Sequence, residues 1–224
     1  MPIAKQKLIL LSLVAGVALI LFMWFGNPSI LSYLIKEDGV IENLSAIFFA
    51  AGFIIALISF FNNEHIVAPI TWAILCLIFL GEEVSWFQRL FNYSVPLIEQ
   101  VNAQHEFNFH NLTVFHGGAL IGEDVKLNSF FKSQNLFRIG FFGYFLIIPI
   151  LHINPILAEF FKKKGYIKAD SYFTIVLFIV FTLSLLLAVI APLTVKHALN
   201  ETREMLYAFF IMLYILFYIQ KKEP

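Results

Sequence analysis

Charged residues are scarce in this sequence, and neither sign is in excess. Only 13% of the 224 residues are charged, 15 acidic and 15 basic, whereas 60% are hydrophobic. Soluble globular domains carry charges on about a quarter of their residues, so the composition excludes that class. The balanced charge also excludes a strongly basic nucleic-acid binder, and no basic cluster interleaved with aromatic residues lies outside the apolar runs, which argues against nucleic acid as a partner. The composition is that of an integral membrane protein, whose first partner is the lipid bilayer.

Cysteine occurs once, at Cys76, inside an apolar run. A single cysteine excludes an intrachain disulfide and any cysteine-based metal site. A cleavable signal is not indicated either, because the apolar run from Leu8 to Phe25 exceeds the roughly 7–15 residues of a signal core and no small-residue cleavage motif follows it. We expect this run to remain as the first transmembrane helix.

Six apolar runs are long enough to cross about 30 Å of hydrocarbon at roughly 1.5 Å per residue. They predict an all-α fold, a single transmembrane domain over residues 1–224 built as a polytopic membrane helix bundle of about six helices. The expected spans are residues 8–26, 40–61, 67–89, 136–153, 171–194 and 202–220, and residues 90–135 form the one long outer loop.

Lysines gather on one side of this topology. They precede the first span, lie between the fourth and fifth spans, and follow the sixth span. An even number of spans places all three groups on the same side, which the positive-inside rule makes cytoplasmic. We therefore predict a multi-pass protein of the inner (plasma) membrane with both termini in the cytoplasm.

The third predicted span ends in a polar motif, Gly81-Glu82-Glu83-Val84-Ser85-Trp86-Phe87-Gln88-Arg89. If the helix continues to the end of this motif, one face carries Glu82, Ser85, Trp86 and Arg89. Charges at a membrane boundary usually persist because something partners them. Two interpretations remain open: Glu82 and Arg89 form a structural ion pair, or Glu82 or Glu83 acts as a general acid or base.

A second polar pattern lies in the outer loop, where polar and apolar residues alternate. The polar positions are Asn102, Gln104, Glu106, Asn108 and His110, and the apolar ones are Ala103, Phe107 and Phe109. This period of two predicts an extended ribbon with its apolar side against the protein. A helix is the alternative, and it would pair Glu106 with His110.

Carboxylates and imidazoles at one membrane face are candidates for catalysis and metal binding. The candidate catalytic residues are Glu82, Glu83, Arg89 and Glu106. Zinc sites use three or four ligands, and the candidate ligands for a divalent metal, zinc or manganese, are His110, Glu106, His197 and Glu201. Further residues expected in the same pocket are Glu42, Asn43, Gln88, Gln104, Asn108 and Glu204. In the alternative interpretation, these side chains satisfy the backbone of a loop tucked between helix ends.

The two motifs, together with Glu37-Asp38-Gly39 and Glu42, resemble those of a family of uncharacterised bacterial multi-pass membrane proteins. That family carries G-E-E-I-S-W-G-Q-R and N-x-Q-x-E-x-N-x-H-N. The likeness covers about residues 37–111, with Val84 in place of the family's Ile and Phe87 in place of its Gly. The resemblance implies a bacterial membrane protein and supplies no mechanism.

Two functions fit these observations. The convergence of acids, histidines and amides at one depth predicts a membrane-embedded hydrolase of a lipid or lipid-linked substrate at the outer face. Its reactive group is either a carboxylate together with a metal-bound water or a carboxylate without a metal. The alternative is a non-enzymatic membrane component, such as a sensor, transporter or assembly partner, in which these groups form a structural polar network. The predicted spans carry no charge at their midpoints and no inverted repeat, which argues against a transporter.

Overall fold

The structure, a computed structural model, describes residues 3–36, 39–62, 66–102, 105–109, 112 and 133–219. Within these ranges the regular structure is helical, and the one β-bridge is an isolated antiparallel contact between Asn102 and Leu112. The predicted all-α fold is therefore confirmed for the described residues.

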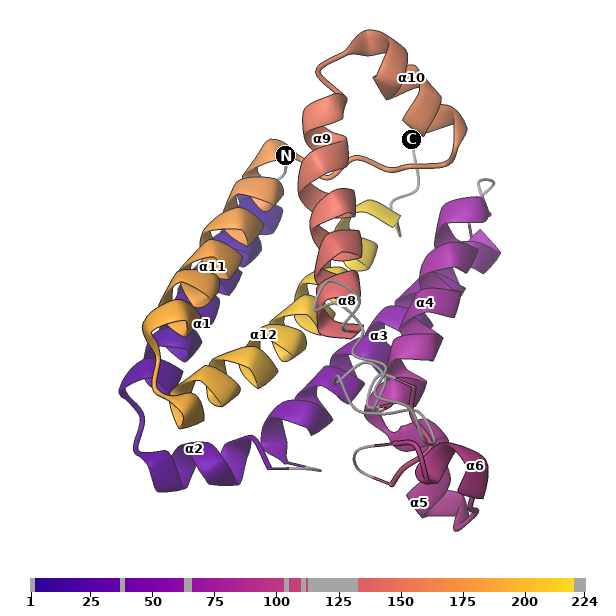
Figure 1. Cartoon of the computed structure of the whole chain (residues 1–224). Helices are drawn as coiled ribbons and strands as arrows, with labels where there is room; N and C mark the ends of the chain where they lie inside the picture. Colours follow the sequence, from indigo (N-terminus) through magenta and orange to yellow (C-terminus); the bar gives the residue numbers. More distant parts are fainter. Residues whose placement is uncertain are drawn as a thin grey trace, which may run out of the picture.

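Four of the described helices are long and apolar enough to cross a membrane, as expected for an integral membrane protein. They are α1 (Ile3–Phe25), α3 (Val40–Asn62), α11 (Ser171–Ile190) and a continuous helix over Leu193–Ile219. This last helix consists of α12 (Leu193–Tyr214) and one π turn, η4 (Ile215–Ile219). In its most apolar stretch 67% of the residues are buried, against 28–39% in the other three, so α12 is the central helix. Figure 1 shows it crossing between the α1–α11 pair and α3.

Two further apolar helical segments complete the bundle. Helix α4 (Val67–Glu83) packs along α3, and a continuous segment formed by α8 (Ser133–Phe142), the π turn η3 (Gly143–Ile147) and α9 (Ile148–Leu151) lies across a cavity from α4. Both segments lie where the third and fourth spans were predicted.

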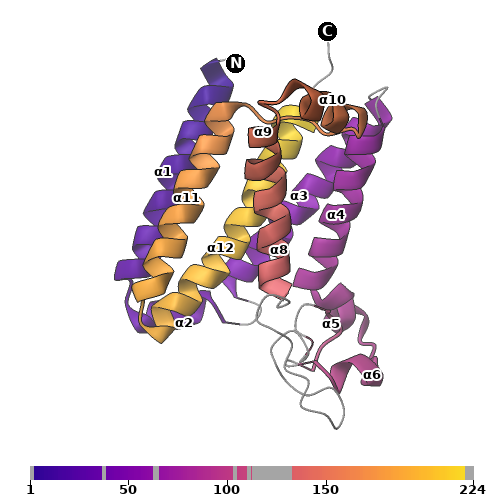
Figure 2. The ribbon, with the colours of Figure 1, turned by 45° about the horizontal axis from the view of Figure 1, so that its top comes forward.

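Short helices mark the two ends of the bundle (Figure 2). At one end lie α2 (Pro28–Leu34), α5 (Gln88–Phe91) and α6 (Pro96–Glu99); at the other end lie both chain termini and α10 (Pro155–Lys163). We call the first the acidic end, because Glu82, Glu83 and Glu204 lie there, and the second the terminal end. Helices α2 and α10 both begin with Asn-Pro, in which the asparagine side chain caps the helix and proline occupies the first turn.

The prediction that the third helix continues to Arg89 is wrong. Helix α4 ends at Glu83, and the next three residues after Val84 have left-handed backbones, with φ of 47° at Ser85, 51° at Trp86 and 62° at Phe87. This turn folds the Trp86 ring back onto Gly81, where a Cβ atom would lie only 2.7 Å from the indole. The residues of the motif therefore do not share one helical face.

The boundary between the last two helices also differs from the prediction. Helix α11 ends at Ile190 instead of residue 194, and α12 begins at Leu193 instead of residue 202. Ala191 and Pro192 have extended backbones, with ψ of 143° and 155°, and they turn the chain between the helices. As a result His197, Glu201 and Glu204 lie inside α12.

Candidate functional site

The left-handed turn after α4 is held by its tryptophan. The Trp86 indole Nε1 donates a hydrogen bond to Glu82 Oε1 at 2.7 Å, and the Tyr93 hydroxyl donates to the Trp86 carbonyl at 2.9 Å. The second oxygen of Glu82 accepts from the Phe109 backbone N–H at 2.7 Å. The Glu82 carboxylate thus joins the end of α4 to the loop segment that contains Phe109.

Glu106 makes the corresponding connection from the loop. Its Oε2 accepts from the Ser85 hydroxyl and, at 3.4 Å, from the Asn108 amide, which also reaches Ser85 Oγ at 3.2 Å. Asn102 in turn donates to both the backbone and the side-chain oxygen of Asn108 at 2.8 Å. Because Asn102 and Asn108 are each only 2% exposed and Ser85 4%, these polar groups satisfy one another out of contact with water.

Gln88 and Glu99 extend this network from the end of α4 to α6. Gln88 donates to Glu99 Oε1 at 2.5 Å and accepts from the Phe107 N–H at 2.6 Å. Glu99 also accepts from the Val95 N–H and the Ser94 hydroxyl, each at 2.8 Å. These donors, the Val95 N–H foremost, lower the pKa of the Glu99 carboxyl below its ordinary value.

The structure therefore brings the two predicted motifs together, but it uses Glu82, Gln88, Glu106 and Asn108 to hold the loop on α4. The prediction of a ribbon with its apolar side against the protein is wrong for the described positions, because Asn108 is buried while Phe109 is 46% exposed. The polar side turns inward because the hydrogen-bonding groups at the end of α4 need partners there. Gln104 and His110, and the side chain of Arg89, lie outside the described residues.

A second group of carboxylates lies beside this network. Glu83, at the end of α4, is within electrostatic range of Glu82 and of acids on two other helices, Glu42 on α3 and Glu201 and Glu204 on α12. These acids come from α3, α4 and α12, segments distant in the sequence, and they lie near one another at the acidic end. Asn43 has a local role, since its amide donates to the Gly39 carbonyl at 2.9 Å at the start of α3.

Among the described residues no group of three or more His, Cys, Asp or Glu side chains is placed to hold a metal ion. His197 and Glu201 do face each other across one helical turn, as their spacing predicts, with Nδ1 and Oε1 3.4 Å apart.

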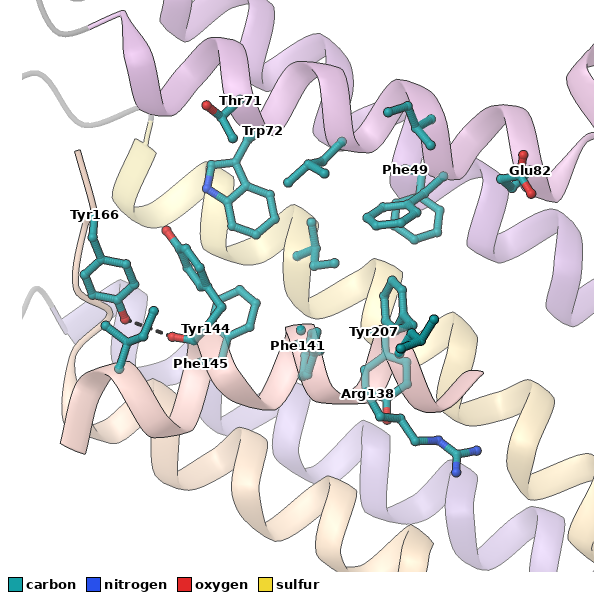
Figure 3. Close-up of a pocket in the computed structure, with 18 of the residues that line it drawn as sticks. Phe49, Thr71, Trp72, Glu82, Arg138, Phe141, Tyr144, Phe145, Tyr166 and Tyr207 are labelled. Carbon is teal, nitrogen blue, oxygen red and sulfur yellow. Dashed lines mark hydrogen bonds between the residues drawn. The ribbon is translucent and has the colours of Figure 1, made fainter. Parts of the chain in front are cut away.

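An elongated cavity of about 770 Å³ extends from the acidic end into the bundle (Figure 3). Helix α4 forms one wall, α8, η3 and α9 the other, and α12 contributes Tyr207 and Ile211. Its middle is apolar and aromatic. The charged residues at the acidic end are Glu82, Glu83, Arg138 and Glu204, whereas Lys164 and Tyr166 lie at the terminal end. The lining residues of α4 run from Val67 to Glu83, a length of about 24 Å at roughly 1.5 Å per residue.

Arg138 and Tyr207 were not among the residues predicted for the site. Arg138 has a sequence signal, because it is a lone charge at the start of the fourth apolar run. Tyr207 has none, since a tyrosine within an apolar helix is ordinary, and only the packing of α12 against α8 brings it to the cavity.

No protein-family model, curated protein or solved structure matches this chain.

Proposed function

We propose that the protein binds a lipid or lipid-linked molecule in the cavity between α4 and the α8–α9 segment. The observation that carries this proposal is the form of the cavity, a long apolar channel with charged groups at its acidic end. Its volume of about 770 Å³ is in the ordinary range for small-molecule sites. An apolar wall holds a hydrocarbon chain at little cost. The cluster of charged groups at the acidic end, which faces the single Lys164 at the terminal end, orients the polar head.

In this proposal the chain crosses the inner (plasma) membrane six times, with both termini in the cytoplasm. The 17 residues of α4 span about 26 Å, close to the hydrocarbon thickness, and the apolar helix Asn135–Leu151 is equally long. The lysines near the terminal end support the orientation through the positive-inside rule.

Cysteine labelling tests the topology. Leu97, which is 81% exposed in α6, and Lys164, after α10, are each replaced by cysteine, while Cys76 is fully buried and stays in place. An impermeant maleimide should label position 97 but not position 164 in intact cells, and both positions after solubilisation in detergent. Labelling of position 164 in intact cells contradicts the orientation.

Two glycines of the α8–η3 segment provide a matched test of binding. A Cβ atom at either Gly140 or Gly143 would meet nothing within 4 Å, but only Gly140 lines the cavity. Gly140→Leu should therefore fill the cavity and reduce several-fold the lipid that stays bound after detergent exchange, measured by mass spectrometry. Gly143→Leu should leave the lipid content unchanged. Equal lipid in both variants would show that the cavity is not the lipid site.

Hydrolysis of the bound lipid is a second candidate function, favoured by the carboxylates of Glu83 and Glu204 in the cavity wall. Glu82 and Glu106 are engaged in holding the loop, so Glu83 is the better candidate for a general acid or base. With purified protein and vesicles of extracted bacterial lipid, Glu83→Gln should lower product release at least about 100-fold while lipid binding persists. If the wild-type protein releases no product, the non-enzymatic alternative remains.

Lipid binding in this cavity does not require the zinc or manganese ion that the sequence predicts. Glu106 is bonded to Ser85 and Asn108, and Glu201 faces His197. The expectation of zinc or manganese at His110 is tested separately, by elemental analysis of protein purified without chelators beside a His110→Ala variant. Stoichiometric metal that the variant lacks would support it.

A further inference from the structure

Arg138 brings the positive charge of a guanidinium group to the acidic end of the cavity. Its guanidinium donates to Asn135 Oδ1 at 3.3 Å, and among the described side chains no carboxylate lies within ion-pair distance of it. A guanidinium offers five N–H donors in a planar fork that matches the oxygens of a phosphate group. Arg138 is thus equipped to bind a phosphate.

The hydroxyl of Tyr207 is a second donor at the same place. This side chain is only 2% exposed and lines the cavity, and its hydroxyl makes no hydrogen bond of good geometry to a described residue. The group within reach of it is the Arg138 guanidinium, which is itself a donor, so the hydroxyl proton still lacks an acceptor. Its ring is fixed by stacking on Phe181, with centroids 4.5 Å apart and planes 11° from parallel. Figure 3 shows the hydroxyl beside the Arg138 side chain. A buried hydroxyl without a partner is unfavourable, and a phosphate oxygen would satisfy it.

A further guanidinium lies behind this pair. Arg203 on α12 is 1% exposed, and its Nη atoms contact Ser184 and Asn200 while its Nε has no partner in the described structure. It acts electrostatically on both Arg138 and Tyr207, and it is itself within electrostatic range of the carboxylates of Glu201 and Glu204. Because these carboxylates already face Arg203, the phosphate is assigned to Arg138 and Tyr207.

Carboxylates line the same end of the cavity. Glu83 comes from α4, the wall opposite Arg138, whereas Glu204 comes from α12, one helical turn before Tyr207. Glu42 and Glu201 are within electrostatic range of Glu83. A purely anionic head group would be repelled by these acids, and a purely cationic one by the guanidinium groups. A head group with both charges, its anion facing Arg138 and its cation facing Glu83 across the cavity, avoids both penalties.

The geometry points to a zwitterionic phospholipid with a primary ammonium, the phosphatidylethanolamine class, with its phosphate at Arg138 and Tyr207 and its ammonium at Glu83 and Glu204. A primary ammonium donates three hydrogen bonds to carboxylates, which a quaternary choline group cannot do. This inference rests on the proposed lipid-binding function and specifies which lipid the cavity selects.

The test compares lipids that share acyl chains and differ in the head group. Binding to the full-length protein in detergent is measured by native mass spectrometry for phosphatidylethanolamine, phosphatidylglycerol and phosphatidylcholine. The wild-type protein should prefer phosphatidylethanolamine at least about tenfold over both, because each charged hydrogen bond is worth about that factor. Equal or weaker binding of phosphatidylethanolamine overturns the inference.

Variants assign the two charges to the two walls. Arg138→Gln should weaken phosphatidylethanolamine binding about tenfold. Tyr207→Phe, which removes only the hydroxyl, should weaken it several-fold with circular dichroism unchanged. Glu83→Gln should remove the preference over phosphatidylglycerol. Lys162→Gln, on the exposed surface of α10 and outside the cavity lining, is the control and should change none of these values.

The outcomes separate this inference from the proposed function. If Gly140→Leu removes bound lipid while Arg138→Gln and Tyr207→Phe leave head-group preference unchanged, the cavity binds lipid and the head-group assignment is wrong. If Gly140→Leu also retains its lipid, both the assignment and the proposed function fail.

Discussion

Replacement of Gly81 by alanine should destabilise the protein through a single contact. The indole of Trp86 lies against this glycine, so the new Cβ would be 2.7 Å from Cδ2 and 2.8 Å from Cε2 and Cε3. The ring has little freedom to move away, because its Nε1 is bonded to Glu82 at 2.7 Å and its backbone is left-handed, with φ 51°. Relief of the clash therefore requires the turn itself to open.

Opposing contributions set the size of the effect. Alanine is favoured over glycine in a helix by up to about 1 kcal/mol. Against this, overpacking costs about 1–3 kcal/mol, and loss of the indole-to-carboxylate hydrogen bond costs about 1.5–3 kcal/mol. We expect Gly81→Ala to lower the free energy of unfolding by about 1.5–5 kcal/mol.

The assay is reversible unfolding in mixed micelles, followed by circular dichroism, within a double-mutant cycle. In a Trp86→Ala background the clash is absent, so Gly81→Ala should be neutral or stabilising by up to about 1 kcal/mol. Gly140→Ala, which meets nothing within 4 Å, is the control and should also be neutral or slightly stabilising. If Gly81→Ala costs the same with and without Trp86, or costs nothing in the wild-type background, the contact does not hold the turn.

Three further predictions concern the loop and the terminal end. Ser85→Ala removes a donor to Glu106 and should cost about 1.5–3 kcal/mol locally, seen as faster hydrogen exchange over residues 105–109; unchanged exchange would show that the loop is held elsewhere. Because the pKa of Glu99 is lowered in the folded protein, its contribution to stability is complete above the ordinary value of about 4.3 and is lost as the pH falls through the lowered value. Protection of the amides in residues 94–99, expressed relative to their intrinsic exchange rate at each pH, should therefore fall only in acid, and Glu99→Gln should remove that dependence. Asp170 caps α11 and lies 3.4 Å from Lys5 Nζ, so Asp170→Ala should cost about 1 kcal/mol more than Asp170→Asn, which keeps the cap; equal melting temperatures would contradict this.

Much of the fold could be read from the sequence, because a membrane helix is specified by a local property. Uninterrupted apolar length predicts α1, α3 and α11 to within a few residues, since each satisfies its own backbone and needs no partner to be stable in lipid. The convergence of the two polar motifs could also be predicted, and Ser85 and Glu106 are bonded across it. Buried polar groups must find partners, and these motifs supplied the polar groups closest to the end of the third predicted span.

Other features depend on the tertiary structure. Helix α4 stops at Glu83 because Trp86 packs back on Gly81 and Glu106 bonds to Ser85, contacts between residues whose local sequence would equally support a continued helix. Arg138 and Tyr207 meet at the cavity only because α8 and α12 pack together opposite α4. No pattern of spacing in the sequence indicates that these two residues lie close together. Apolar length by itself determined which segments are helical. The packing of helices distant in sequence decided which side chains share a site, because the periodicity of one helix shows which of its faces is buried but does not identify the helix that packs against it.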